Sequence, residues 1–565
     1  MRGRILSASI AAGLLSTAVF AQQNETIVVP TTSYGVSQPL YQLALEQTAA
    51  NAALTSEGPY VASEMIQKHG PLVTDFESSA PTSVTALPSF VQQQNSATRA
   101  FGAVANTTFE GPGTGLPGFV LTGAPPDTTL AVGPNHIVAW VNSQYAIFAK
   151  NGTVLLGPVN GNTLFTGVGG ICETTNRGDP ILQYDKLADR WILSQFAFGV
   201  AAGSPTGPYA QCVAISTTNN PTGTYFRYVI SFSTTTPSGL NDYGKLGIWP
   251  DGYYTTYNMF GGTPAGSNTG VALCVSDRVK MLVGDITATT LCAPIGFYGG
   301  GASFLPGDLD GTTLPTTTAQ GNIMMRYSGT QNLRIIKLKP DFATSTVTLN
   351  DGLGGPAGSV ISLPVPGTVI SCNGTGGTCI PQPGTTNQLD TLGSRLMYRL
   401  AYRNRGGVDS LVVTHSVDPD GASGVNSAVR WYEVRSPFSA TPNLFQNATY
   451  RPDASDRWMG SIAMDKMGNM LMGYSVANAV AGLKPSLRVA GRYRTDLRNQ
   501  MQAESTIVTG TGSQTGTLTR WGDYSTMQVD PVDDCTFWYI GEYLAADGTF
   551  NWRTRIASYK FNGCN

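Results

Sequence analysis

The sequence has 565 residues, of which 12% are charged, and its formal net charge at pH 7 is −2. Its 66 glycines accompany many serines, threonines and tyrosines, a composition typical of an all-β extracellular protein. No basic patch is evident along the chain, which argues against nucleic acid as a partner.

The chain opens with the features of a secretory signal peptide. Arg2 and Arg4 give a positive start, residues 5–20 form an apolar run, and the small residue Ala21 follows. The run is too short for a membrane span, and no later run is long enough. We therefore predict a signal peptide over residues 1–21, no membrane span, and a secreted protein, extracellular or periplasmic.

Residues 22–105 differ in character from the rest of the chain. Residues 40–54 combine helical spacing with a high content of alanine, glutamine and leucine. The runs around them are polar and rich in proline, serine and threonine, as in residues 78–83. We expect an N-terminal extension or pro-segment, partly helical and partly disordered, ahead of a domain spanning residues 106–565.

A hairpin pattern recurs within residues 106–565. In each copy a polar residue precedes a short apolar strand, a turn of glycine, proline, asparagine or aspartate, and a second apolar or aromatic strand. The copies begin at Asp127, Asp179, Asp242, Arg395 with Asp390 just before it, Asp456 and Asp523.

Repeated small antiparallel sheets of this length predict a β-propeller. The interval between Asp242 and Asp390 is about twice as long as the others and holds the strand-like runs 323–327 and 333–337. These runs fit either the outer strands of one enlarged blade or a seventh blade without the leading motif. The sequence favours six blades and leaves seven open.

The last blade is short of one strand in its own sequence. Propellers complete such a blade with a strand from the other terminus, which removes a free edge. We therefore predict that a strand within about residues 100–122 pairs into the C-terminal blade.

The chain contains 8 cysteines, and an even number in an exported protein indicates disulfides. Sequence alone does not fix the pairing, but joining nearest neighbours would close each loop within one blade. The cysteines are Cys172, Cys212, Cys274, Cys292, Cys372, Cys379, Cys535 and Cys564. With only 3 histidines and no CxxC or HExxH pattern, we expect no zinc site and no cofactor.

Two short acidic runs have the start of a calcium loop. Asp308 and Asp310 form one, Asp418 and Asp420 the other, and a glycine follows each. Neither run has the distal glutamate of an EF-hand. Ordinary turns are the favoured interpretation, with structural calcium as the alternative.

If the first strand of each repeat is innermost, the residues before it meet at one end of the central channel. Paired carboxylates suit glycoside hydrolysis, and arginine forks suit acidic sugars. The candidate catalytic residues are Asp179, Asp242 and Asp523. The candidate substrate-binding residues are Arg177, Arg395, Arg457, Arg520, Trp458, Trp521, Tyr243 and Tyr524.

These residues also have a purely architectural interpretation. An aspartate at the start of an inner strand can cap its own turn or bond to neighbouring backbone N–H groups. An Asp–Arg pair can equally join adjacent blades. Recurrence at equivalent positions favours the architectural role for any single aspartate.

The repeats resemble those of sialidase-like propellers, whose blade turns carry the Asp-box pattern Ser-x-Asp-x-Gly-x-x-Trp. The nearest copies are residues 463–469 and residues 529–531 followed by Trp538. Ala463 stands where the pattern has serine, and Gly468 comes one residue late. The opening residues 125–135 are also similar to those of uncharacterised secreted bacterial propellers. The resemblance implies a propeller with glycoside hydrolase-like architecture.

The leading hypothesis is a secreted, monomeric propeller that binds or cleaves extracellular polysaccharide or glycoprotein glycans at the channel mouth. If it is an enzyme, glycoside hydrolase is the first class and polysaccharide lyase the second. The competing hypothesis is a non-catalytic adhesion or interaction protein that uses the propeller as a rigid scaffold.

Overall fold

The structure is a computed structural model that describes residues 26–51, 60–61, 90–92, 98–201, 204–233, 239–261, 268–293, 303–328, 331–356, 358–374, 376–420 and 426–565. The predicted signal peptide lies outside these residues. Within them, no helix has the length and apolar character needed to cross a membrane.

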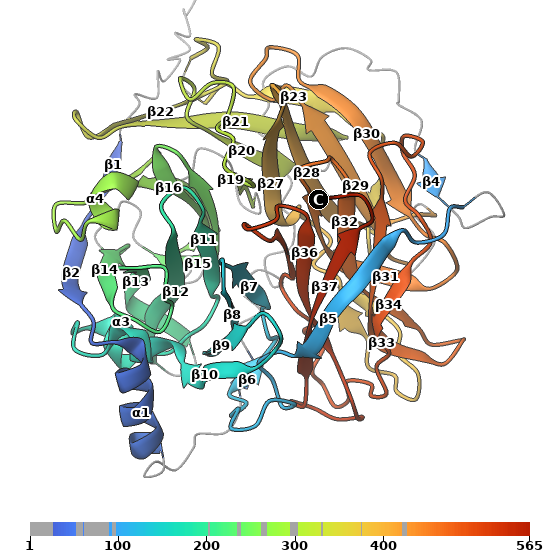
Figure 1. The fold of residues 1–565 in the computed structure, drawn as a ribbon, viewed down its shortest axis with the longest axis horizontal. Coiled ribbons are helices and arrows are strands. Elements are labelled where there is room, and N and C mark those ends of the chain that lie inside the picture. The colour runs from blue at the N-terminus through green and yellow to red at the C-terminus, as the bar shows by residue number, and fades with distance from the viewer. Residues whose placement is uncertain are drawn as a thin grey trace, which may run out of the picture.

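Strand pairing in the described residues forms seven antiparallel groups of four strands, arranged in a ring (Figure 1). Each innermost strand contacts the next, and the last contacts the first, so the ring is closed. We call the groups blades 1 to 7 in chain order. Their innermost strands are β7 (Thr129–Val132), β11 (Ile181–Asp185), β15 (Leu240–Trp249), β19 (Leu305–Leu309), β27 (Met397–Arg405), β31 (Asp456–Met464) and β35 (Thr526–Val529).

The outer strands follow their inner strand along the chain in blades 1 to 6. In blades 1 to 3 they are β8 (His136–Val141), β9 (Gln144–Ala149), β10 (Val154–Asn160), β12 (Arg190–Ala201), β13 (Ser204–Ser216), β14 (Tyr225–Ser231), β16 (Gly252–Phe260), β17 (Asn268–Ser276) and β18 (Thr290–Cys292). In blades 4 to 6 they are β20 (Asn322–Tyr327), β21 (Asn332–Asp341), β22 (Thr346–Asn350), β28 (Val408–Asp418), β29 (Ala428–Arg435), β30 (Asn443–Tyr450), β32 (Met470–Asn478), β33 (Leu483–Arg492) and β34 (Ser505–Val508).

Blade 7 is closed by the strand predicted from the N-terminal side. Its own strands β36 (Thr536–Tyr543) and β37 (Arg553–Phe561) are joined by β5 (Ala103–Glu110), which pairs antiparallel with β37. Figure 1 shows β5 lying along β37. The closure prediction is confirmed.

The count of seven blades in the described residues differs from the six that the sequence favoured. The interval before Asp390 forms a blade of its own, built from β19 to β22. Its inner strand contains Pro306 and Gly307, which are poor strand formers, and no aspartate leads into it. β19 also pairs parallel with β27, which joins blades 4 and 5 into one continuous sheet.

The N-terminal segment pairs with the outer edges of several blades. β1 (Ile27–Val29) adds to β18 in blade 3, β2 (Thr31–Val36) adds to β14 in blade 2, and β4 (Val91–Gln92) adds to β30 in blade 5. The predicted helix is present as α1 (Leu40–Asn51). Residues 22–25, 52–59, 62–89 and 93–97 of the predicted extension lie outside the described residues.

Smaller elements connect or flank the blades. The helical ones are η1 (Gly161–Phe165), α3 (Ile171–Thr174) and α4 (Arg278–Leu282). The short strands are β3 (Tyr60–Val61), β6 (Gly123–Ala124), β23 (Ile361–Pro364), β24 (Val369–Ile370), β25 (Thr378–Ile380) and β26 (Leu389–Asp390).

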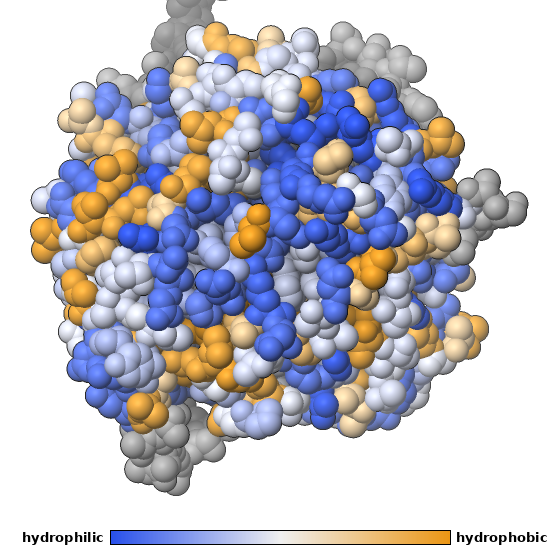
Figure 2. Space-filling view, viewed as in Figure 1, coloured by the Kyte–Doolittle hydropathy of each residue, from blue (hydrophilic) through white to orange (hydrophobic). Residues whose placement is uncertain are grey.

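Large aromatic side chains fill the spaces between blades. Trp249 and Tyr402 lie with ring centroids 4.7 Å apart, which joins blades 3 and 5. At Gly133, a Cβ would lie 2.5 Å from the ring of Trp191, so only glycine allows that close approach between blades 1 and 2. On the face seen in Figure 2, hydrophilic residues predominate over the centre and hydrophobic residues form small separate groups.

The four disulfides join each cysteine to its nearest neighbour along the chain, a pairing that the sequence left open. The bonds are Cys172–Cys212, Cys274–Cys292, Cys372–Cys379 and Cys535–Cys564. All cysteines are therefore paired.

Loss of the Cys535–Cys564 bond is expected to destabilise blade 7. The bond closes a loop with a sequence separation of 29 and ties the last residues to the sheet they complete. Closing a loop of this length is worth roughly 3 kcal/mol in the chain-entropy model. Urea unfolding of Cys535→Ser/Cys564→Ser should show that loss. An unchanged midpoint, or free thiols at both positions in the wild-type protein, would contradict it.

Candidate functional site

Polar residues at the start of several inner strands converge at one end of the ring. Asp127 and Asp179 lie two residues before β7 and β11, and Asp523 lies three residues before β35. Because the inner strands contact one another around the ring, the starts of these strands lie at the same end. We call this end the carboxylate mouth. It comprises Asp127, Asp179, Asp242, Lys245, Asp390, Arg395, Arg520 and Asp523.

Two tyrosines tie blades 2, 3 and 7 together at the carboxylate mouth. The Tyr243 backbone N–H donates to Asp179 Oδ2 at 3.2 Å, and its hydroxyl donates to the Asp523 carbonyl at 3.2 Å. The Tyr524 hydroxyl donates to the Pro180 carbonyl at 2.9 Å. These bonds fix Asp179 and Asp523 relative to each other across the ring.

Lys245 lies at the centre of this group and was not predicted. Its Nζ lies 3.3 Å from the ring centroid of Tyr243 and 4.2 Å from that of Tyr524. It donates to the Tyr243 and Gly244 carbonyls at 3.3 and 3.0 Å. Burial lowers the pKa of Lys245 to about 7, although the carboxylates of Asp179 and Asp523 oppose that shift.

The aspartates of the carboxylate mouth differ in proton affinity. Burial raises the pKa of Asp179 to about 6, with a further contribution from Asp523. Burial and the nearby charges of Asp179 and Asp523 raise the pKa of Asp242 to about 8. Burial also raises the pKa of Asp127 well above its ordinary value, and neither of its carboxylate oxygens hydrogen-bonds to a described residue. The mouth therefore combines carboxyl groups that hold a proton near neutral pH with others that release it.

Arginines balance part of this charge. Arg520 donates to Asp523 in a close ion pair, and its Nε lies 4.0 Å from Asp390 Oδ2. Arg395 donates to Ser303 Oγ at 3.3 Å, and its guanidinium carbon lies 4.8 Å from the ring centroid of Tyr243. The structure thus brings two of the four predicted arginines to the mouth.

The other two predicted arginines have different partners. Arg177 donates from Nε to the Phe198 carbonyl at 3.1 Å. Arg457 pairs with Asp453 at 2.8 Å and with Glu504 at 3.0 Å, all within blade 6. The guanidinium of Arg457 is thus engaged by carboxylates of its own blade and not by the aspartates of the carboxylate mouth.

The two tryptophans predicted to bind substrate are buried between blades and expose no ring surface at the mouth. Trp458 and Trp521 are 0% and 1% exposed, and their ring centroids lie 5.9 Å apart between blades 6 and 7. Trp521 Nε1 donates to Ser475 Oγ at 3.1 Å. Tyr243 and Tyr524 are equally buried. These rings stabilise the contact between blades, since burying a large aromatic surface is more favourable than exposing it.

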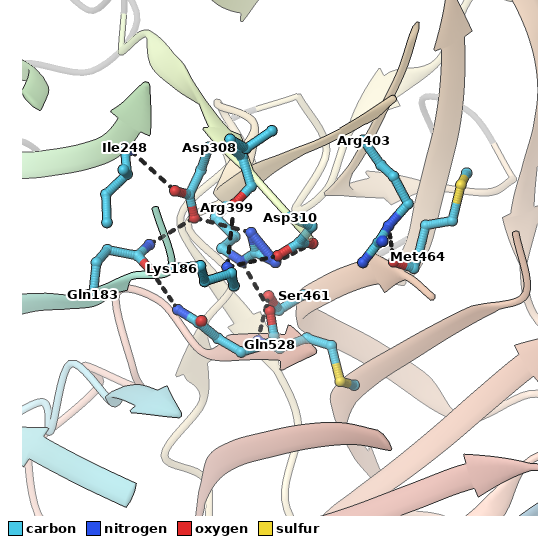
Figure 3. A network of polar contacts seen from close by, with 12 residues as sticks. Gln183, Lys186, Ile248, Asp308, Asp310, Arg399, Arg403, Ser461, Met464 and Gln528 are labelled. Carbon is cyan, nitrogen blue, oxygen red and sulfur yellow. Dashed lines mark hydrogen bonds and ion pairs between the residues drawn. The ribbon is translucent and has the colours of Figure 1, made fainter. Parts of the chain in front are cut away.

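A second polar network crosses the ring centre (Figure 3). Arg399 pairs with Asp308 at 2.9 Å and with Asp310 at 2.5 Å, and it donates from Nε to the Met527 carbonyl at 3.0 Å. Gln183 donates to Asp308 at 2.7 Å and accepts from Gln528 at 2.7 Å. The network links blades 2, 4, 5 and 7.

Both calcium candidates have other partners. Asp308 and Asp310 hold the Arg399 guanidinium, with Lys186 also 3.3 Å from Asp310. Asp420 pairs with Arg451 at 2.5 Å, and its backbone N–H donates to Asp418, as in an ordinary turn. Among the described residues, no three or more His, Cys, Asp or Glu side chains are arranged to hold a metal ion.

Comparisons with known proteins give no family assignment. No family model matches the chain, and no curated protein matches it. A GH93 α-L-arabinofuranosidase of Fusarium graminearum aligns at 9% identity and a TM-score of 0.33, over 81% of this chain and 97% of that one. A GH62 α-L-arabinofuranosidase of Coprinopsis cinerea aligns at 10% identity and a TM-score of 0.28, over 68% and 92%. Extracellular domains 1-2 of Drosophila Semaphorin 1b align at 6% identity and a TM-score of 0.34, over 83% and 88%.

Proposed function

We propose that this protein binds extracellular glycans at the carboxylate mouth and cleaves them as a glycoside hydrolase. The observation that carries the proposal is the convergence of Asp179, Asp242 and Asp523 at one end of the ring. Glycoside hydrolysis needs one carboxylic acid to protonate the leaving oxygen and one carboxylate to act as base or nucleophile. Pairs of titratable groups whose environments separate their pKa values supply these two roles.

The environments of the three aspartates support a division of these roles. Asp242 keeps its proton at neutral pH and is only half-buried, so we assign it the general acid. Asp179 loses its proton at lower pH than Asp242 and is the candidate base or nucleophile. Asp523, held in place by its ion pair with Arg520, lies beside these two groups and is a candidate to contact the sugar.

The same groups support a proposal for the substrate class. Arg395 contacts hydroxyls and an aromatic ring, and it forms no ion pair with a described carboxylate. A buried guanidinium of this kind suits an acidic substituent on the sugar, as in sialidase-like enzymes. A polysaccharide lyase would use the same mouth with Lys245, whose lowered pKa suits proton abstraction, as the base.

A non-catalytic scaffold is the second candidate, and the burial of the mouth favours it. Asp127, Asp179 and Asp523 are 1%, 9% and 6% exposed. Carboxylates enclosed to this degree can serve mainly to join blades, which leaves the propeller as a rigid platform for another molecule.

A glycan-array screen combined with product analysis on polysaccharide mixtures separates these candidates. New reducing ends with saturated products support hydrolysis, and unsaturated products support a lyase. Binding without products supports the scaffold acting as an adhesin. The absence of both binding and products, across neutral and acidic glycans, would contradict the proposed function.

A further inference from the structure

Arginines gather at the end of the ring opposite the carboxylate mouth. Arg405 ends β27, whereas Arg395 of the carboxylate mouth precedes that strand. The side chains around Arg405 come from blades 5 and 6, and electrostatic contact links them to one another. We call Arg405, Arg435, Arg494 and Arg498 the arginine patch.

Phe445 holds two of these cations close together. The guanidinium carbon of Arg435 lies 3.2 Å from the ring centroid of Phe445, and the guanidinium carbon of Arg498 lies 4.0 Å from it. Cation–π contact favours both placements. The ring therefore presents two guanidinium groups side by side, which an isolated surface loop would not do.

The loop that carries Arg494 and Arg498 is anchored at several points. Arg492 donates to the Gln500 carbonyl at 3.1 Å and to the Asp496 carbonyl at 2.8 Å. The Arg494 backbone N–H donates to Asn469 Oδ1 at 3.0 Å. Arg492 thus acts as a positioning residue, and the patch is pre-formed rather than assembled on binding.

The carboxylates near the patch are already engaged. Glu433 accepts from Arg435 Nε at 2.6 Å and from Gln446 at 2.5 Å. Asp496 pairs with Arg99 at 2.5 Å. Asp465 accepts from the backbone and side-chain N–H groups of Asn469, both at 2.8 Å.

Arg405 lacks a compensating partner. Its side chain makes no hydrogen bond or ion pair with the part of the chain that the structure describes. Burial and the charges of Arg435 and Arg494 lower the pKa of Arg405. Together they outweigh the carboxylates of Glu433 and Asp465, which act in the opposite direction. Like charges held this close repel one another, and a bound anion would relieve that repulsion.

We propose that the arginine patch binds the sulfate or carboxylate groups of an acidic polysaccharide. Guanidinium forks match oxyanions in a bidentate geometry, and several in a rigid array suit a polymer with repeated charges. The four disulfides indicate an oxidising compartment outside the cytoplasm, where acidic polysaccharides are abundant polyanions. Nucleic acid is less favoured, since guanidinium groups cover the ring on which bases would stack.

The arginine patch is separate from the carboxylate mouth, and the sequence alone did not reveal it. Its arginines are spread from residue 405 to residue 498 and come together only when blades 5 and 6 pack. A chain with net charge −2 can therefore present a local basic surface.

The test compares binding of the full chain to heparin, which carries sulfate, to alginate, which carries carboxylate, and to a DNA duplex of matched charge. The variant Arg494→Gln/Arg498→Gln removes two exposed charges of the patch. The variant Lys280→Gln/Lys339→Gln removes the same net charge from blades 3 and 4 and serves as the matched control.

We expect wild-type protein to bind heparin or alginate with an affinity that falls steeply with salt. The patch variant should bind about tenfold more weakly. Its slope of log affinity against log salt concentration should be shallower by about 2, because two counterion-releasing contacts are gone. The lysine control should bind as the wild type does. Equal weakening in both variants, no binding of either polysaccharide, or preference for the DNA duplex would overturn the proposal.

Discussion

Replacing Arg399 with methionine is expected to lower the free energy of unfolding by about 3–5 kcal/mol. Arg399 is fully buried and pairs with both Asp308 and Asp310, so its removal leaves Asp308 without its ion-pair partner and Asp310 with Lys186 alone, 3.3 Å away. The variant also loses the bond from Arg399 to the Met527 carbonyl that links blades 5 and 7. Urea unfolding followed by tryptophan fluorescence measures the change.

A compensated variant separates the charge effect from loss of packing. Arg399→Met/Asp308→Asn removes the cation together with the carboxylate it leaves unpaired and keeps Asp310 for Lys186, so it should be more stable than Arg399→Met alone. An Arg399→Met protein as stable as the wild type would mean that the network does not hold the blades together.

Replacing Asp242 with asparagine is expected to reduce glycan cleavage by about 10²–10⁴-fold, the range for loss of a general acid. The pH profile of the wild-type enzyme should rise through about pH 6 as Asp179 ionises and fall through about pH 8 as Asp242 loses its proton. Residual activity of the variant should lack the alkaline fall. Rates of reducing-end release between pH 4 and pH 10 provide the measurement.

Stability gives an independent check on the same variant. Because the folded state raises the pKa of Asp242 above its ordinary value, the folded protein binds this proton more tightly than the unfolded chain. The contribution of the Asp242 carboxyl to the free energy of unfolding is therefore lost as pH rises from about 4 to about 8. Asparagine cannot ionise, so Asp242→Asn should be no less stable than the wild type at pH 8. Lost activity caused by unfolding at that pH would contradict the assignment.

The residues that open each repeat predicted the inner strands well. Asp179 and Asp523 lie two and three residues before β11 and β35, and Asp456 begins β31. Polar turn residues followed by short apolar runs are local signals, so they can be recognised without knowledge of the rest of the fold. The pairing of β5 with β37 was predictable for a different reason, namely that a propeller leaves no free edge in its last blade.

Side-chain direction was harder to predict. Adjacent residues on a strand face opposite sides, so Arg457 and Trp458 cannot both point into the same mouth. Asp242 and Lys245 would face opposite sides of a regular strand, but the register of β15 shifts between them and brings both to the mouth. A bulge of this kind leaves no clear mark in the sequence, which explains why Lys245 was missed.

Direct titration of wild-type protein and Asp523→Asn with a glycan identified in the array screen tests the central claim most directly. The matched control is Asp456→Asn, which alters an equivalent position in blade 6 whose carboxylate accepts from the Ser427 backbone N–H outside the mouth. If the carboxylate mouth recognises glycan, Asp523→Asn should bind at least about tenfold more weakly, as expected for loss of a charge-assisted contact, while Asp456→Asn binds normally. Equal affinity in all three folded proteins would show that the mouth joins the blades and does not bind the glycan.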